Sequence, residues 1–408
     1  SGPGRKERFV NVLVLNSGSS SIKYQLFDMS DRSLLAGGAA ERIGDEGGRL
    51  VHGRRERGGR FHEEVTSAGL ENHGDALDLI MTALGDAISQ GSGLGAIGHR
   101  VVHGGEAFRQ PCVIDEQVIE TIRDLSPLAP LHNPANLLCI EVSMARLPGV
   151  PQVAVFDTAF HQTIPPRAYR YAVPDRWYES LGVRRYGFHG PAHAFVAKQA
   201  ARHLGQPLDE LNLIVLHLGN GASAAAIASG KSMDTSMGMT PLEGLVMGTR
   251  SGDLDPGVIL HLAREAGMSV DEIDADLNGQ SGLEGLCGVS DMRDALERER
   301  EGDPRAKLAL DVYTYRIRKY IGAYMAALGR VDGIVFTAGV GENSPDIRAR
   351  TCAGLEGLGV ELDETRNRAK RNDARPIHRD GASIAVLVVP TNEELEIAEQ
   401  TLRCVQQR

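Results

Sequence analysis

The sequence has little cysteine, few aromatic residues and no long hydrophobic run. Its 408 residues include five cysteines and one tryptophan, and aromatic residues make up 5%. The cysteines are odd in number, lie far apart and form no CxxC pair, which argues against a disulfide framework or a structural zinc site and favours a reducing compartment. No apolar run approaches the ~20 residues of a membrane-spanning helix. We therefore expect a cytoplasmic protein without a membrane partner.

Positive charge is also scarce. The chain has 44 Lys and Arg residues against 54 Asp and Glu residues, a net charge of -10. An acidic chain without a basic block is a poor candidate for nucleic-acid binding. If the protein handles anionic substrates, it must concentrate positive charge locally.

Three familiar catalytic motifs are absent as well. The sequence has no GxxxxGK[ST] P-loop, no HExxH zinc motif and no GxSxG nucleophile elbow, which disfavours a P-loop kinase, a zinc protease and a serine hydrolase. His189 and His193 are four residues apart, but no third ligand has a clear spacing, so zinc is weakly indicated.

The first distinctive stretch is an apolar run at residues 12–15, followed by a Gly/Ser-rich turn and a second apolar run at 22–27. This pattern predicts a buried strand, a tight turn and a return strand. Gly18 allows a sharp turn, the turn serines supply polar groups, and Lys23 adds positive charge. Together they suit a phosphate or a metal-bound phosphate. A solvated hairpin turn is the alternative.

The same pattern recurs roughly 200 residues later, with apolar runs on either side of a Gly-Asn-Gly turn at 219–221. The recurrence suggests an internal duplication. Asn133 is a favourable N-cap for a helix that reaches about Leu147, and residues 281–293 are expected to form a Gly-rich loop. Further elements are predicted from periodicity: strands at 94–102, 152–156, 333–336 and 384–389, and helices at 75–90, 303–328 and 394–404.

Charged and polar residues stand where apolar runs end. Arg100 and Asp157 each follow such a run, and Arg250 lies in a long polar loop. A guanidinium matches carboxylate or phosphate oxygens in two-point contacts, although a surface ion pair or a helix N-cap would explain these residues too. His189 lies in a Gly-flanked turn before a helix, where it suits a proton or oxyanion contact. The small residues at 337–344 would let a flat ring or a ribose approach the backbone, or would simply connect a strand to a helix.

Taken in order, these stretches resemble acetate kinases, members of the acetate and sugar kinase/heat-shock chaperone/actin superfamily. The resemblance covers nearly the whole chain and is carried by residues 16–23, 99–105, 130–134, 156–161, 186–190, 217–221, 248–256, 338–343 and 391–394. It implies an α/β fold of two duplicated RNase-H-like domains with a cleft between them. The first domain would be 9–160 completed by a C-terminal helix at 392–408, and the second, nucleotide-binding domain would be 161–391.

The resemblance also implies an activity. The expected reaction is reversible, direct in-line transfer of a phosphoryl group from ATP to acetate, giving acetyl phosphate and ADP. It would use Mg²⁺, with Mn²⁺ as an alternative, and the protein would be a homodimer. Phosphoryl transfer depends mainly on positioning and charge neutralisation, which fits an acidic chain that gathers a few cationic groups.

The resemblance assigns roles to individual residues. Arg100 and Arg250 would hold the carboxylate and the phosphoryl group, Asp157 would lie near the attacking oxygen, and His189 would donate to the transition state. The acetate pocket would comprise Arg100, Val102, Leu131, His132 and Pro241. The nucleotide site would comprise Ser19, Ser21, Lys23, His217, Leu218, Gly219, Asn220, Gly221, Asp291, Met292, Arg293, Gly339, Val340, Gly341, Glu342 and Asn343. Asn16 and Glu393 would hold the metal through oxygen atoms.

One departure from the family pattern stands beside His189. Many members have Thr-Ser where this chain has Pro191 and Ala192, so two hydroxyls that could hydrogen-bond near this histidine are missing. Three alternatives remain at this level. A small apolar pocket discriminates weakly by one methylene, so the acid could be propionate or butyrate. A noncatalytic nucleotide-binding switch would lack Arg100 and Arg250, and a hydrolase would need Ser19 or Ser21 as nucleophile.

Overall fold

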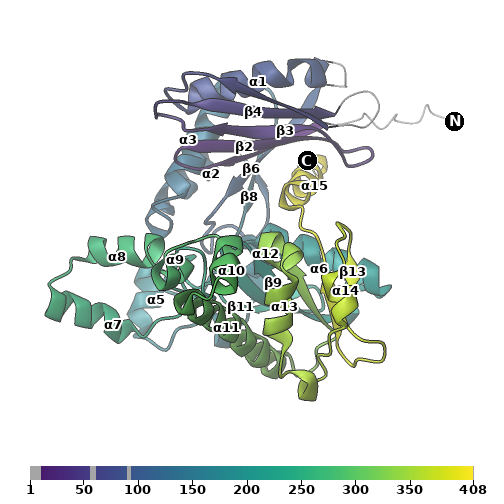
Figure 1. Ribbon diagram of the computed structural model, residues 1–408. Coiled ribbons are helices and arrows are strands. Elements are labelled where there is room, and N and C mark those ends of the chain that lie inside the picture. The colour runs from purple at the N-terminus through teal and green to yellow at the C-terminus, as the bar shows by residue number, and fades with distance from the viewer. Residues whose placement is uncertain (1–10, 56–60, 90–92, 408) are drawn as a thin grey trace. The chain divides into compact units, whose positions relative to one another are not determined.

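The chain folds into two compact units, seen in the computed structural model (Figure 1). The structure describes residues 11–55, 61–89 and 93–407. The first unit holds the described residues up to Ala159 together with those from Asn392 onward, and the second holds Phe160–Thr391. The chain thus leaves the first unit, builds the whole second unit, and returns with its C-terminal helix.

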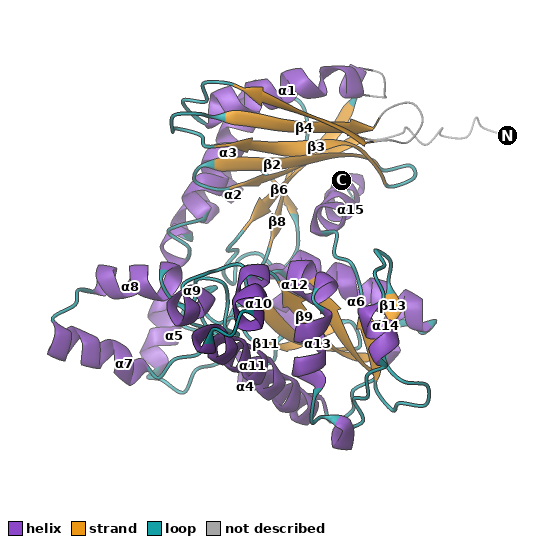
Figure 2. Cartoon of the chain, viewed as in Figure 1, coloured by secondary structure: helices purple, strands orange, loops and turns teal. Residues whose placement is uncertain are grey.

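The described part of the first unit is built on an eight-stranded sheet with the order β5-β4-β3-β2-β1-β6-β8-β7. Strands β1 to β5 form an antiparallel meander, whereas β6 pairs parallel with β1, and β8 parallel with β6. Figure 2 shows this sheet in orange beside α1. The strands are β1 (Asn11–Ser17), β2 (Ser21–Asp28), β3 (Ser33–Glu41), β4 (Arg49–Arg55), β5 (Phe61–Ser67), β6 (Leu94–Val101), β7 (Cys112–Val113) and β8 (Gln152–Phe156).

Residues 12–15 of the central strand β1 are all apolar because helices cover both faces of the strand. Leu13 and Leu15 belong to a buried cluster with Leu77 of α1, and Val12 and Ile397 belong to a second cluster on the face packed by α15. A strand buried on both sides needs a continuous apolar run, which is the pattern at residues 12–15. The helices of this unit are α1 (His73–Ser89), α2 (Glu116–Asp124), a 3-10 turn (Ser126–Leu128), α3 (Asn133–Arg146) and α15 (Glu393–Gln406).

The described part of the second unit has a six-stranded sheet with the order β11-β10-β9-β12-β14-β13. Its strands are β9 (Asn212–Leu218), β10 (Ala222–Ala228), β11 (Lys231–Thr235), β12 (Gly333–Thr337), β13 (Arg375–Pro376) and β14 (Ala385–Val388). Strand β9 pairs antiparallel with β10 and parallel with β12, as β1 does with β2 and β6. The predicted α/β fold with two duplicated sheets is confirmed.

Helices surround this second sheet. They are α4 (Pro166–Tyr169), α5 (Asp175–Leu181), α6 (Gly190–Leu204), α7 (Pro256–His261), α8 (Val270–Gly279), α9 (Gly282–Cys287), α10 (Met292–Arg300), α11 (Pro304–Leu328), α12 (Ala338–Asn343), α13 (Pro345–Cys352) and α14 (Glu364–Arg368). Shorter turns lie at Ala159–Thr163, Leu208–Glu210, Leu262–Ala266 and Glu356–Leu358. Within the described ranges, none of the helices combines the length and apolarity that crossing a bilayer requires.

Two local predictions were wrong. The N-cap of α3 is His132, and the Asn133 side chain instead exchanges hydrogen bonds of 3.0 Å with the backbone N–H and carbonyl of His103. The Asn133 side chain therefore pairs the buried backbone groups of His103 and does not cap its own helix, because buried backbone groups need hydrogen-bond partners. Residues 281–293 are not one loop, because they contain helix α9.

Candidate active site

The turn between β1 and β2 is held in place by its own backbone and by two helices of the first unit. The Gly18 N–H donates to the Ser21 carbonyl at 2.8 Å, which closes the turn. The Ser17 carbonyl accepts a hydrogen bond from Asn136 Nδ2 of α3 at 2.7 Å, and the Gly18 carbonyl lies 2.9 Å from His73 Nε2 of α1. Ser19 and Lys23 remain exposed. A fixed turn with free side chains is suited to contacting a ligand.

Four predicted site residues of the first unit meet at the ends of β1, β6 and β8 and at the start of α15. We call Asn16, Arg100, Asp157 and Glu393 the carboxylate cluster. Arg100 donates from Nε to Asp157 Oδ1 at 2.9 Å and from Nη2 to Asp157 Oδ2 at 2.6 Å. Its Nη1 donates to Asn16 Oδ1 at 3.3 Å. The arginine fork is thus engaged by a carboxylate of the protein.

Glu393 enters this cluster because Asn392 caps α15, accepting a hydrogen bond from Leu395 N at 3.0 Å. Glu393 Oε1 lies 2.9 Å from Arg100 Nε, whose single hydrogen is already donated to Asp157. The oxygen is therefore buried in an ion pair without a hydrogen bond. Burial raises the pKa of Glu393 to about 7, with Arg100 opposing the shift and Asp157 adding to it.

The oxygen atoms of the carboxylate cluster fit a hard cation. Glu393 supplies a buried oxygen that lacks a hydrogen-bond donor, and Asn16 supplies an amide oxygen beside the same guanidinium. Mg²⁺ prefers such oxygens and retains several waters, so one or two protein ligands suffice. Among the described residues, no group of three His, Cys, Asp or Glu side chains could hold a metal ion.

The residues predicted for the acid pocket belong partly to the first unit and partly to the second. Val102, in the first unit, is buried, and its N–H donates to Asn136 Oδ1 at 3.1 Å. Leu131 is 64% exposed, and His132 caps α3. Pro241 belongs to the second unit, where its carbonyl accepts a hydrogen bond from Arg250 Nη1 at 2.8 Å.

In the second unit, four residues form what we call the histidine cluster: His189, His193, His217 and Ser223. The Ser223 hydroxyl lies 2.9 Å from His189 Nδ1 and 2.8 Å from His193 Nε2. The rings of His189 and His217 are stacked with centroids 4.4 Å apart. Sequence patterns missed Ser223, because it stands in the small, apolar run of β10, where it looks like a core position.

The backbone at His189 is strained. Its φ of 58° lies in the left-handed region, which a residue with a side chain adopts at a cost. The preceding turn is fixed by His161, whose Nε2 lies 3.0 Å from the Phe188 carbonyl. Gly187 has a φ of +78°, and a Cβ there would lie 2.8 Å from the His161 ring. Strain of this kind is typical of a residue that must present its side chain in one direction.

Arg250 and His189 converge on the Gly-Asn-Gly turn between β9 and β10. A Cβ added to Gly221 would lie 3.4 Å from Arg250 Nη2 and 3.7 Å from His189 Nε2. No carboxylate of the described residues forms an ion pair with Arg250, and burial lowers its pKa. A half-buried guanidinium without a counter-charge favours the binding of an anion.

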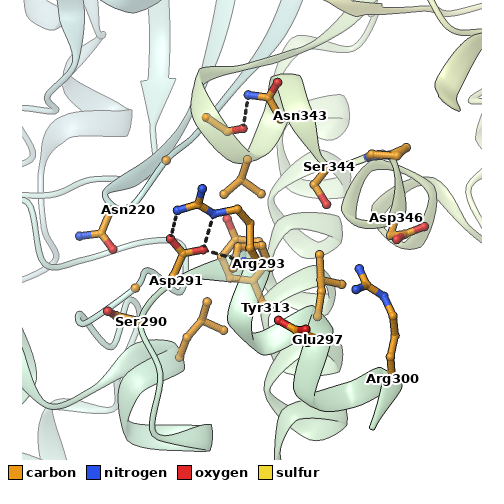
Figure 3. A pocket seen from close by; sticks show the side chains of 18 residues that line it. Asn220, Ser290, Asp291, Arg293, Glu297, Arg300, Tyr313, Asn343, Ser344 and Asp346 are labelled. Carbon is orange, nitrogen blue, oxygen red and sulfur yellow. Dashed lines mark hydrogen bonds and ion pairs between the residues drawn. The ribbon is translucent and has the colours of Figure 1, made fainter. Parts of the chain in front are cut away.

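A pocket of about 730 Å³ opens in the second unit beside this turn (Figure 3). Predicted nucleotide residues that line it are Gly219, Asn220, Asp291, Met292, Arg293, Gly339, Val340 and Asn343. Asp291 caps α10 and forms a two-point ion pair with Arg293, which lowers the pKa of Asp291 to about 2. The pocket is large enough for a nucleoside, and it has both apolar walls and a few polar groups.

Several predicted nucleotide residues do not line this pocket, namely His217, Leu218, Gly221, Gly341 and Glu342. Glu342 instead accepts a hydrogen bond from the Thr391 N–H at 3.0 Å. Ser19, Ser21 and Lys23 belong to the first unit. The lining also includes residues that sequence patterns missed: Glu297, Arg300, Tyr313, Ser344 and Asp346. They lie on or beside helices, where periodicity does not separate a ligand contact from a surface position.

Comparisons with known proteins identify the family of this chain. The model of the acetokinase family matches residues 11–399. The acetate kinase of Streptomyces avermitilis is 55% identical over 396 residues, which cover 97% of each chain. The crystal structure of Porphyromonas gingivalis acetate kinase has a TM-score of 0.91 at 43% identity and covers 97% of this chain and 100% of its own. A propionate kinase from Francisella tularensis has a TM-score of 0.91 at 40% identity, covering 97% and 99%. The chain belongs to the acetokinase family.

Proposed function

We propose that this protein transfers a phosphoryl group between ATP and acetate, reversibly and with Mg²⁺, producing acetyl phosphate and ADP. The observation that carries the proposal is the convergence of Arg250 and His189 on the Gly221 turn, at the edge of the 730 Å³ pocket. Relatives named acetate kinase match this chain over nearly their whole length, which supports the choice of reaction.

The second unit would hold the nucleotide and the phosphoryl group in transfer. Adenosine would occupy the pocket between Asp291–Arg293 and Gly339–Asn343, with the phosphates at the turn of Gly219–Gly221. Arg250, which lacks a counter-charge, and His189 would neutralise the equatorial oxygens of the transition state. Stabilisation of developing charge by fixed donors accounts for much of the acceleration in such reactions.

The first unit would hold the acid. A carboxylate nucleophile is already ionised at neutral pH, so Asp157 has no need to act as a strong base and would orient the acceptor through Arg100. Asn16 and Glu393 would hold Mg²⁺, which supplies positive charge to the phosphates when bound. Binding both substrates correctly oriented converts a bimolecular encounter into a unimolecular step.

Propionate is the second candidate acceptor, because a propionate kinase has the same TM-score to this chain as an acetate kinase. The predicted pocket residues Val102, Leu131 and Pro241 are apolar, and one extra methylene changes binding by only ~1–3 kcal/mol.

The experiment is to incubate the protein with Mg-ATP and acetate, propionate or butyrate in separate reactions, trapping the acyl phosphate with hydroxylamine. Acetyl hydroxamate with the highest kcat/KM supports the proposal. A preference for propionate or butyrate would change the acceptor, and the absence of any product while ATP still binds would refute the activity.

We also propose that the protein is a homodimer, as expected for the family. Four apolar side chains on and after α7 are exposed: Val258 by 36%, Ile259 by 37%, Leu260 by 53% and Val270 by 77%. A cluster of this kind suits association with a second copy. Sedimentation equilibrium should give twice the chain mass, and Leu260→Glu should shift the protein toward monomer. An unchanged mass in the variant would exclude this surface.

A further inference from the structure

Ser223 is fully buried between two histidines, and its hydroxyl is within hydrogen-bond distance of both. His189 Nδ1 is 2.9 Å from Ser223 Oγ, and His193 Nε2 is 2.8 Å from it. Ser223 and His193 are each 0% exposed. Among the described residues, the Ser223 hydroxyl has no other partner, so its single hydrogen must go to one of these rings if it is not to be buried unpaired. The hydroxyl therefore donates to one ring and accepts from the other.

The chain of hydrogen bonds can therefore run in two directions. In the first, His193 Nε2–H donates to Ser223, and the Ser223 hydroxyl donates to His189 Nδ1. In the second, both bonds are reversed, and His189 Nδ1–H donates to Ser223. The two directions leave the proton of a neutral His189 on opposite nitrogens, so they present different groups at Nε2.

The Nδ1 atom of His193 decides between the two directions of the hydrogen-bond chain. His193 Nδ1 is buried and has no hydrogen-bond partner among the residues that the structure describes. The second direction would place a hydrogen on this atom and leave a buried N–H without an acceptor, which folded proteins avoid more strictly than an unused acceptor. Burial lowers the pKa of His193 well below its usual range, with His161 and His217 adding to the shift, so its ring carries one proton. That proton belongs on Nε2.

We infer that Ser223, backed by His193, holds neutral His189 in the tautomer that carries its proton on Nε2. His189 Nε2 lies on the side of the ring that faces the Gly221 turn and Arg250. The N–H is then ready to donate to a phosphoryl oxygen before substrate binds, and no proton has to move first. This assigns a positioning residue and rests on the proposed function for the role of His189.

The two residues that follow Gly190 after His189 supply no hydroxyl to its ring. Positions 191 and 192 are Pro and Ala, both buried in the first turn of α6. The hydroxyl that contacts His189 comes from β10 instead, across the sheet-to-helix packing. The His189 ring is therefore oriented by a hydroxyl from a different element of the fold.

A second serine-histidine pair in the same unit provides a matched control. His161 Nε2 lies 3.0 Å from the Phe188 carbonyl, which only accepts, so this nitrogen carries the proton. His161 Nδ1 then accepts from the buried Ser232 hydroxyl at 2.7 Å. Ser232→Ala removes the same kind of serine–histidine hydrogen bond as Ser223→Ala. The bond is lost from the His161 ring, which is not one of the groups that converge on the Gly221 turn.

The test is a long-range proton–nitrogen NMR spectrum of the full chain, labelled with ¹⁵N-histidine, at pH 8 and without substrates. His189 is assigned from the signals lost in His189→Gln. We expect its proton on Nε2 in the wild type and in Ser232→Ala, and a mixture of both tautomers in Ser223→Ala. A wild-type proton on Nδ1, or an unchanged tautomer in Ser223→Ala, would overturn the inference.

Kinetics provide the second measurement. Ser223→Ala should lower kcat about two- to tenfold, the effect of one neutral hydrogen bond, with little change in either KM. Ser223→Thr, which keeps the hydroxyl, should restore both the tautomer and most of kcat. A loss of kcat in Ser223→Thr, with the wild-type tautomer of His189 retained, would count against the link between this tautomer and the rate. The NMR result does not depend on activity, so failure of the proposed reaction would be recognised separately.

Discussion

Both units present an arginine near the turn that follows their first strand, but the two arginines have opposite surroundings. Arg100 contacts Asp157 and Glu393, and these carboxylates raise its pKa above the usual range although burial opposes the shift. Arg250 donates to the Pro241 carbonyl, and among described residues it has no carboxylate partner. The charge of Arg100 is therefore balanced within the fold, whereas the charge of Arg250 is not balanced by a carboxylate of the described residues.

The strand ends differ in the same way. Strand β8 of the first unit is followed by Asp157, and β6 carries Arg100. The strand of the second unit that matches β6 is β12, and it runs into Ala338, with a φ of 63°, and then Gly339. One copy of the topology has charged groups where the other has small ones. Under the proposed function, duplication supplied one scaffold for two tasks, holding a small charged acid and holding a flat nucleoside.

The largest expected effect comes from removing the balanced arginine. Arg100→Ala leaves Asp157 and Glu393 without their cation, and breaking a buried ion pair from one side costs about 3–5 kcal/mol of folding free energy. Urea unfolding of the first unit should show a loss of this size. The control is Arg123→Ala, whose partners Glu120 and Glu141 are exposed and whose loss should cost about 1 kcal/mol or less. Equal losses would mean that the cluster does not stabilise the fold.

Removing the unbalanced arginine should affect catalysis and spare stability. Arg250→Ala should lower kcat about 10²–10³-fold, as expected for one fixed donor to developing charge. Arg250→Lys keeps the charge but loses the two-point geometry, and should lower kcat about tenfold or more. Both variants should lower the free energy of unfolding by only about 0.5–1.5 kcal/mol, because the hydrogen bond to the Pro241 carbonyl is lost but no ion pair is broken. A Lys variant with a near-wild-type rate would remove Arg250 from the chemistry.

Acid should weaken the first unit through His99. The ring of His99 is buried, and its Nε2 is hydrogen-bonded to Gln152 Oε1 at 2.6 Å. Burial lowers the pKa of His99 to about 4, from 6.5 in the unfolded chain. The unfolded state binds the proton more tightly, so the stability that His99 contributes is present above pH 6.5 and is lost as the pH falls toward 4. The full loss is about 3 kcal/mol.

The measurement for His99 is the free energy of unfolding of the first unit at pH 7 and at pH 4.5, for wild type and His99→Gln. The variant cannot take up this proton, so its stability should fall less between the two pH values. Identical slopes would show that His99 does not control the acid response.

A structural feature could be predicted from the sequence where the residues that form it are close together along the chain. The apolar runs of β1 and β9 and the turns after them are encoded within a dozen residues, so their pattern predicts them. Asp157 lies 57 residues from Arg100, and Asn16 and Glu393 stand at opposite ends of the chain. Only the family resemblance brought these residues together. Neither the sequence patterns nor the family resemblance pointed to Ser223. A serine in an alanine-rich strand has the pattern of a core residue, and the inferred role of Ser223 depends on the rings of His189 and His193, which lie outside its strand.

The smallest expected effect tests whether the second unit holds the nucleotide. Arg293 is 89% exposed and pairs with Asp291, so Arg293→Ala should leave the unfolding temperature nearly unchanged. Because the side chain lines the pocket, its loss should raise KM for ATP about two- to tenfold, the range of an exposed charged or cation–π contact, and leave KM for acetate unaltered. Arg371 provides a matched control, since it pairs with Asp373 two residues away in the same two-point geometry and does not line the pocket. Arg371→Ala should change neither constant. An equal rise in both KM values for Arg293→Ala would mean that the nucleotide and the acid are not held by separate groups.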